Sequence, residues 1–174
     1  MATKLGVYNE AALILKQRPV ASLSEQTPTR VIFDQAWAPT LEYMIGVGRW
    51  HFGARTVALE KEDAAVPEFG FANYFAKPED YAGLVWISAS PYGMPTLNDF
   101  SEEGAYWAAD CNPLYMKFIS NGATYGGDLS KWTPHFTRAV AYELADRTAG
   151  SLTKASANDL ERLAKMKERA LHKA

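Results

Sequence analysis

Apolar residues recur every three or four positions near both ends of the chain, which is the spacing of one face of an α-helix. Near the N-terminus this pattern runs from Val7 to Arg18 and stops at Pro19, which predicts a short first helix. A second helix is expected to begin between about Thr27 and Arg30, with a kink at Pro39. Together the two helices are expected to occupy about residues 7–48.

The helical spacing returns in the last quarter of the chain. Thr133 followed by Pro134 is typical of a helix start, because threonine caps the first turn and proline fits the first helical position. This helix is expected to continue to Gly150. A last helix is predicted to begin near Ser156, where Asp159 stands three residues later, much as in a capping box. The two helices are expected within about residues 133–173.

The middle of the chain, about residues 49–132, loses the helical spacing and is rich in proline, glycine and aromatic residues. Twelve of the 22 aromatic residues fall within 69–118, enough to give a small sheet its own packed face. Strand-like runs are expected at 49–59, 84–88, 105–109 and 114–119. The sequence therefore predicts a mainly α fold: one domain over residues 1–174, built as a helical bundle with a small β-rich insertion.

Composition limits the class of protein. The 174 residues are 48% hydrophobic, enough for one ordinary core, and the net charge of -2 gives no overall attraction to nucleic acid. The single cysteine, Cys111, allows no intramolecular disulfide and indicates a reducing compartment. The chain has no apolar run of ~18 residues and no signal-like N-terminus, so we expect neither a membrane span nor general secretion.

Charge is distributed unevenly along the chain. Residues 60–110 contain ten acidic residues and two lysines, whereas residues 154–174 contain six basic and three acidic residues. Bases of the last predicted helix recur at three- and four-residue steps: Arg162, Lys165, Arg169 and Lys173. Such a basic stripe could meet an acidic partner, although a merely solvated helix face has the same pattern.

Catalytic and metal chemistry has little support in the sequence. No metal site is expected, because the ligand-type residues lack paired spacing: His51, His135, His172 and Cys111. No phosphate-binding glycine loop follows a strand, so no nucleotide or other cofactor is expected. The remaining chemical candidates are carboxylates that lie close in sequence: Asp99, Glu102, Glu103 and Asp110. A facing pair among them, or Glu10, could perform acid/base hydrolysis, which leaves a small cell-wall hydrolase as the alternative to a non-enzymatic protein.

Several segments resemble one family, the head-to-tail connector or adaptor proteins of tailed bacteriophages, including tail tubular protein A and head-completion proteins of short-tailed phages. The N-terminal segments that carry the resemblance are Tyr8-Asn9-Glu10-Ala11-Ala12-Leu13, Ala21-Ser22-Leu23-Ser24-Glu25 and Trp50-His51-Phe52-Gly53-Ala54-Arg55. The last of these is similar to the family's Trp-x-Phe-Ala-x-Arg block, which Gly53 interrupts by one residue. Later segments are Lys77-Pro78-Glu79-Asp80, Asn112-Pro113-Leu114-Tyr115, Tyr125-Gly126 and Trp132-Thr133-Pro134-His135-Phe136.

The resemblance implies a structural protein of the virion that is made in the host cytoplasm and has no catalytic centre. It implies a ring of copies of this chain, usually twelve, beneath the portal protein of the DNA-filled head. Such a ring closes the head, extends the DNA channel and docks the next tail component, a nozzle or tail tube, while genomic DNA passes through without sequence-specific binding. No membrane partner is implied.

Within this resemblance, two surfaces receive expected roles. The basic stripe of Arg162, Lys165, Arg169 and Lys173 is expected to contact the portal. The acidic residues Asp99, Glu102, Glu103 and Asp110 are expected to face the channel or the distal tail partner, because carboxylates repel the phosphates of passing DNA. A non-viral helical adaptor module stays open as a third interpretation.

Overall fold

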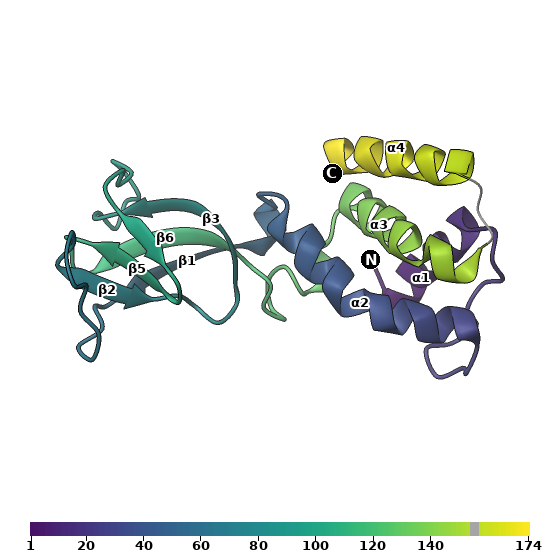
Figure 1. Cartoon of the computed structure of the whole chain (residues 1–174), viewed down its shortest axis with the longest axis horizontal. Coiled ribbons are helices and arrows are strands. Elements are labelled where there is room, and N and C mark those ends of the chain that lie inside the picture. The colour runs from purple at the N-terminus through teal and green to yellow at the C-terminus, as the bar shows by residue number, and fades with distance from the viewer. Residues whose placement is uncertain (154–156) are drawn as a thin grey trace. The chain divides into compact units, whose positions relative to one another are not determined.

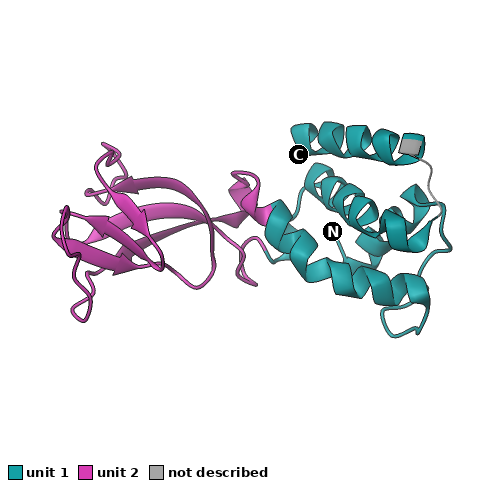
Figure 2. Ribbon diagram, in the orientation of Figure 1, with its two compact units in different colours: residues 1–44, 127–174 teal, residues 45–126 magenta. Residues whose placement is uncertain are grey.

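The computed structural model describes residues 1–153 and 157–174. Over these residues it contains four α-helices and two three-stranded antiparallel sheets, with 42% helix and 19% strand. The chain divides into two compact units, which are residues 1–44 with 127–174 and residues 45–126 (Figure 2). We call them the helical unit and the strand unit and describe each by itself.

The helical unit is built around one central helix. Helix α3 (Pro134–Leu152) packs against α1 (Lys4–Ile14) on one side and α4 (Ala157–Lys173) on another (Figure 1). Helix α2 (Pro28–Gly46) adds residues up to Met44 to this unit. The fully buried side chains of the core come from three of these helices: Val7, Tyr8, Ala11, Phe33, Phe136, Val140 and Leu144.

Local capping explains where the helices begin. The Thr133 hydroxyl accepts a hydrogen bond from the backbone N–H of Phe136 at 3.1 Å, and Pro134 opens α3, as the sequence predicted. Helix α1 begins earlier than expected, because the Thr3 hydroxyl caps it by accepting from the N–H of Gly6 at 3.1 Å. Helix α2 begins at Pro28 and continues through Pro39. The predicted cap at Ser156 lies outside the described residues.

The strand unit contains two sheets. One has the order β1-β6-β3, formed by Ala54–Leu59, Leu114–Ser120 and Tyr81–Ser88. The other has the order β2-β5-β4, formed by Asn73–Ala76, Tyr106–Ala109 and Ser101–Glu103. The predicted strands at 84–88, 105–109 and 114–119 are confirmed with small shifts of their ends. The expected strand at 49–59 begins at Ala54, after a short 3₁₀ turn at His51–Gly53, and β2 and β4 were not predicted.

Both sheets contribute to one apolar core. Antiparallel register places Val57 opposite Met116 in the first sheet and Phe75 opposite Trp107 in the second. The buried members of the core are Phe75, Ile87, Trp107, Ala109, Leu114, Met116 and Phe118. The Trp107 ring lies edge-on to Tyr81 and Phe100, with centroid distances of 5.8 and 5.7 Å. Aromatic packing of this kind stabilises the unit without a disulfide.

The expectation of a mainly α fold with a helical bundle was wrong, since the structure is an α+β fold. The aromatic middle of the chain is not a small insertion in a helical bundle. It forms two sheets that pack around a core of their own. Two sheets that pack on each other bury their apolar faces, so the strands need no helix to cover them. The strand unit spans residues 45–126, against the 49–132 expected for the insertion.

Candidate functional site

The predicted basic stripe lies on α4, and all four of its side chains are exposed: Arg162, Lys165, Arg169 and Lys173. Lys165 pairs with Glu161 of the same helix at 2.6 Å, and both side chains are 65% exposed, so this pair constrains the surface little. Within residues 1–153 and 157–174, Arg169 and Lys173 form no ion pair. The stripe is therefore a solvent-facing cationic surface in the isolated chain.

On the side of α4 that packs against α3, Leu163 is buried and Lys167 forms ion pairs. Leu163 is 7% exposed, whereas Lys167 directs its ammonium group to 2.5 Å from Asp146 and 3.3 Å from Glu143. The Glu143 carboxylate is buried, and the Nε of Arg147 donates to its other oxygen at 2.6 Å. Partial burial alone would lower the pKa of Lys167, but the two carboxylates outweigh it and hold the pKa above its usual value. This contact fixes which face of α4 points outward.

Sequence reasoning missed this ionic contact, although a signal for it exists. Glu143 stands seven residues after Phe136, on the apolar face that Phe136 and Val140 define. A carboxylate at such a position must find a cation when the helix packs, because an unpaired buried charge costs several kcal/mol. Two cations meet Glu143, Arg147 of the same helix and Lys167 of α4, and the predicted basic stripe left out Lys167.

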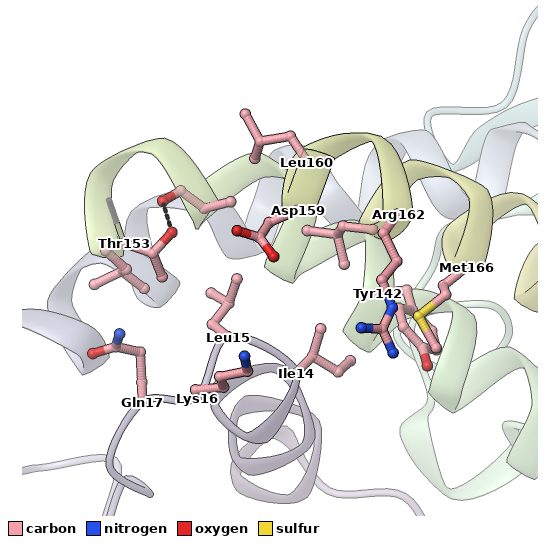
Figure 3. Close-up of a pocket in the computed structure, with 13 residues that line it drawn as sticks. Ile14, Leu15, Lys16, Gln17, Tyr142, Thr153, Asp159, Leu160, Arg162 and Met166 are labelled. Carbon is pink, nitrogen blue, oxygen red and sulfur yellow. Dashed lines mark hydrogen bonds between the residues drawn. The ribbon is translucent and has the colours of Figure 1, made fainter. Parts of the chain in front are cut away.

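A pocket of about 500 Å³ lies beside the stripe, between the end of α1 and the facing parts of α3 and α4 (Figure 3). Its lining combines apolar side chains, Ile14, Leu15, Ala149, Leu152, Leu160, Leu163 and Met166, with the uncharged polar residues Gln17, Tyr142 and Thr153. The charged groups at the pocket are Lys16, Asp159 and Arg162. In Figure 3 the guanidinium of Arg162 is turned toward α1 and lies beside Tyr142 and Ile14. Arg162 therefore belongs to the rim of the pocket as well as to the stripe.

The main chain supports this pocket at the end of α1. Lys16 adopts a left-handed backbone conformation with φ of 56°, and the N–H of Gln17 donates to the carbonyl of Ala12 at 2.8 Å. This is the usual way to end a helix and satisfy its last carbonyls. It places Lys16 directly after the helix and beside the apolar side chains of Ile14 and Leu15 in the pocket wall.

All four predicted acidic residues are exposed in the strand unit, but they do not form one cluster. Glu102 and Glu103 are neighbours on β4, so their side chains project from opposite faces of the sheet. Glu102 pairs with the Lys77 ammonium at 2.6 Å, whereas Glu103 accepts a hydrogen bond from the Tyr74 hydroxyl at 2.5 Å. That bond to Glu103 raises the pKa of Tyr74.

The other two predicted acids lie in loops that flank the same sheet. Asp110 follows β5 and accepts a hydrogen bond from the N–H of Ala72 at 2.8 Å, so it fixes the chain just before β2. Asp99 lies in the loop between β3 and β4. The contact of Asp110 is that of a loop anchor, and the neighbours Glu102 and Glu103 project from opposite faces of β4, so these two do not form a facing pair.

The other chemical candidates also have structural partners. Glu10, on α1, faces Arg138 of α3 at 3.7 Å. Burial raises the pKa of the Cys111 thiol, which disfavours a reactive thiolate. Among residues 1–153 and 157–174, no group of three or more His, Cys, Asp or Glu side chains is close enough to hold a metal ion.

A polar cluster in the strand unit stabilises the edge where β1 begins and β6 ends. The Arg55 guanidinium donates to both oxygens of Asp80 at 2.8 Å, and the Ser120 hydroxyl also donates to Asp80. The N–H of Gly122 in turn donates to the Ser120 hydroxyl oxygen at 3.0 Å. Burial of Asp80 would raise its pKa, but the bonds from Ser120 and Arg55 lower it below its usual value. The cluster links β1, the start of β3 and the end of β6, which is a structural role.

No protein-family model and no curated protein sequence matches the chain. None of the helices in the described part of the chain combines the length and apolar character required to cross a membrane.

Proposed function

We propose that this chain is a structural head-to-tail connector of a tailed phage, which assembles as a ring of about twelve copies beneath the portal. In this role it closes the filled head, extends the DNA channel and docks the next tail component, with no catalytic centre and no cofactor. It is made in the host cytoplasm and functions in the virion.

The observation that carries this proposal is the arrangement of α4. One side of the helix is attached to α3 through Leu163 and Lys167, while Lys165, Arg169 and Lys173 point into solvent. A helix that presents three cations on one face and is itself fixed is suited to bind an acidic protein surface, because opposite charges speed association and select the partner. We assign the portal to this face.

The acidic residues of the strand unit fit the other part of the role. Asp99, Glu102, Glu103 and Asp110 add negative charge to the surface of this unit. A channel wall of that sign repels DNA phosphates, so the genome passes without adhering. We therefore assign these residues to the channel or to the next tail component. Crosslinks from them to the portal alone would contradict this assignment.

The experiment measures binding of the purified chain to assemblies of the portal protein from the same phage by light scattering. We expect one copy bound per portal subunit. The variant that changes Lys165, Arg169 and Lys173 to Glu is expected to lose binding but keep its helical circular dichroism. The matched control changes three exposed bases elsewhere, Arg18, Arg49 and Lys131, to Glu and is expected to bind. Failure of the wild-type chain to bind any portal assembly contradicts the proposed function.

The hydrolase alternative gains no specific support from the geometry. Glu102 and Glu103 diverge across the sheet, and Glu10 is close to Arg138. We therefore do not propose it as a second function.

A further inference from the structure

One loop of the strand unit exposes large apolar side chains. The loop between β1 and β2, residues 60–72, leaves Val66 68% exposed and Phe69 85% exposed. The loop between β3 and β4 likewise exposes Tyr92 and Met94, so exposure by itself does not distinguish the two loops. What distinguishes the β1–β2 loop is the charge around its apolar residues and the way its ends are held. Gly70, with φ of 92° and open space around it, follows Phe69 in the turn.

Hydrogen bonds hold this loop in place at both ends. At its start, the N–H of Lys61 donates to the Asn112 side chain at 3.2 Å, and the N–H of Glu62 donates to the carbonyl of Tyr74 at 2.7 Å. At its end, the N–H of Ala72 donates to Asp110 at 2.8 Å. Because its ends are fixed, the loop presents Phe69 at a defined place, and binding requires little additional ordering.

The loop is also acidic. Around the two apolar residues it carries four carboxylates and one lysine: Glu60, Glu62, Asp63, Glu68 and Lys61. Glu68 is next to Phe69 and is exposed. The loop is thus an apolar knob with negative charge around it, and a complementary partner needs an apolar hollow with positive charge at its rim.

The helical unit of the same chain contains a hollow of this kind. The pocket of about 500 Å³ has apolar side chains from α1, α3 and α4 beside the polar residues Gln17, Tyr142 and Thr153, with Lys16 and Arg162 as its cationic groups and Asp159 as its one carboxylate. Its size falls within the ~300–1,000 Å³ of ordinary binding pockets, so it can receive an aromatic side chain. Two of its apolar residues, Leu160 and Met166, are themselves more than a third exposed.

From this complementarity we propose that the β1–β2 loop of one copy docks into the α1–α3–α4 pocket of a second copy, with Phe69 in the pocket and Glu68 facing Lys16 and Arg162. The contact joins two different surfaces, so a joined pair still has one free pocket on the first copy and one free loop on the second. Repeated contacts of this type close into a ring or extend as a filament. This inference deepens the proposed function, because it names surfaces through which the ring of copies is built.

The contact is expected to be weak on its own. An aromatic side chain buries about 150–250 Å², well below the ~1,000 Å² of a lasting interface. The test therefore uses a covalent trap. A photo-crosslinking amino acid replaces Phe69 in the full chain, isotopically light and heavy copies are mixed, and mass spectrometry locates the crosslinks.

We expect crosslinks between light and heavy copies that join position 69 to the peptides containing Leu160 and Met166. The same crosslinker at Tyr92, which is 90% exposed in the loop between β3 and β4, is the matched control and is expected not to reach those peptides. Changing Lys16 and Arg162 to Glu should reduce the crosslink yield at least severalfold. Adding Glu68→Lys and Asp63→Lys to that variant should restore it, because the charges are then exchanged.

Crosslinks that join position 69 to its own copy, to other surfaces or only to the portal overturn the inference, as does a yield that the charge changes leave unaltered. Portal binding is measured separately on the same samples. Portal binding without the crosslink between copies leaves the connector function standing and refutes this interface. The crosslink without portal binding supports the interface and refutes the connector function.

Discussion

Removal of the Lys167 ammonium group is expected to loosen α4 specifically. Lys167 is 26% exposed and Asp146 is 28% exposed, so their ion pair lies between the exposed and the buried case. Exposed pairs contribute about 0–1 kcal/mol, whereas breaking a buried pair costs about 3–5 kcal/mol. Glu143 is buried but keeps the hydrogen bond from Arg147, which limits the stability lost when Lys167 no longer pairs with it. We therefore expect Lys167→Ala to weaken the docking of α4 by about 1.5 kcal/mol, after discounting for solvent screening.

The assay is amide hydrogen exchange, followed for the peptides of α4 and of α3 separately. A loss of about 1.5 kcal/mol corresponds to about tenfold faster exchange in α4 when the helix opens as a local unit. Lys167→Met keeps the aliphatic stem and removes only the charge, so it separates packing from the ion pair. The matched control is Lys165→Ala, because Lys165 pairs only within α4 with the exposed Glu161 and should change exchange less than about twofold. Equal exchange in the Lys167 and Lys165 variants would refute the reasoning.

Two further predictions concern stability. Hydrogen bonds from Lys4, Tyr8 and Arg30 hold the pKa of Asp34 well below its usual range. The ionised form of Asp34 therefore stabilises the fold above about pH 4, and this contribution is lost as the pH falls further. In urea unfolding, Asp34→Asn should therefore lower stability at pH 6 and flatten its decrease below pH 4, and an unchanged acid profile would contradict this assignment. Gly126→Ala would place a Cβ 2.4 Å from the backbone oxygen of Ser120, whereas at Gly150 in α3 an added Cβ meets nothing within 4 Å. We expect Gly126→Ala to destabilise the chain by about 2 kcal/mol and Gly150→Ala to stabilise it by about 0.5–1 kcal/mol in thermal unfolding, and the opposite order would show that the packing at Gly126 is loose.

Local signals in the sequence predicted much of the secondary structure. Thr133 and Pro134 mark the start of α3 because a cap and the first turn involve residues only three positions apart. The exposed stripe on α4 was predictable for the same reason, since residues at three- and four-residue steps share a helix face in any surroundings. Helix ends were less certain, because α1 uses the Thr3 cap that the apolar spacing does not reveal.

Contacts between distant residues were decided only by the tertiary structure. Lys77 meets Glu102 across 25 positions, and Lys167 meets Asp146 across 21. The short strands β2 and β4 exist because they pair with β5, and four or three residues carry too little pattern to predict a strand alone. For the same reason the predicted fold class was wrong. The local spacing of apolar residues does not show that the middle segments pack against each other and form a core.

The amino-acid sequence by itself determined which residues share a face of a helix or a strand, because that depends only on the period of the backbone. The tertiary structure decided which of those faces meet. It paired Lys167 with carboxylates of α3, left Lys165 in solvent and turned Arg162 toward a pocket, although all three belong to the same helix. The physical reason is that burial and ion pairing depend on the packing partner, which lies far away along the chain.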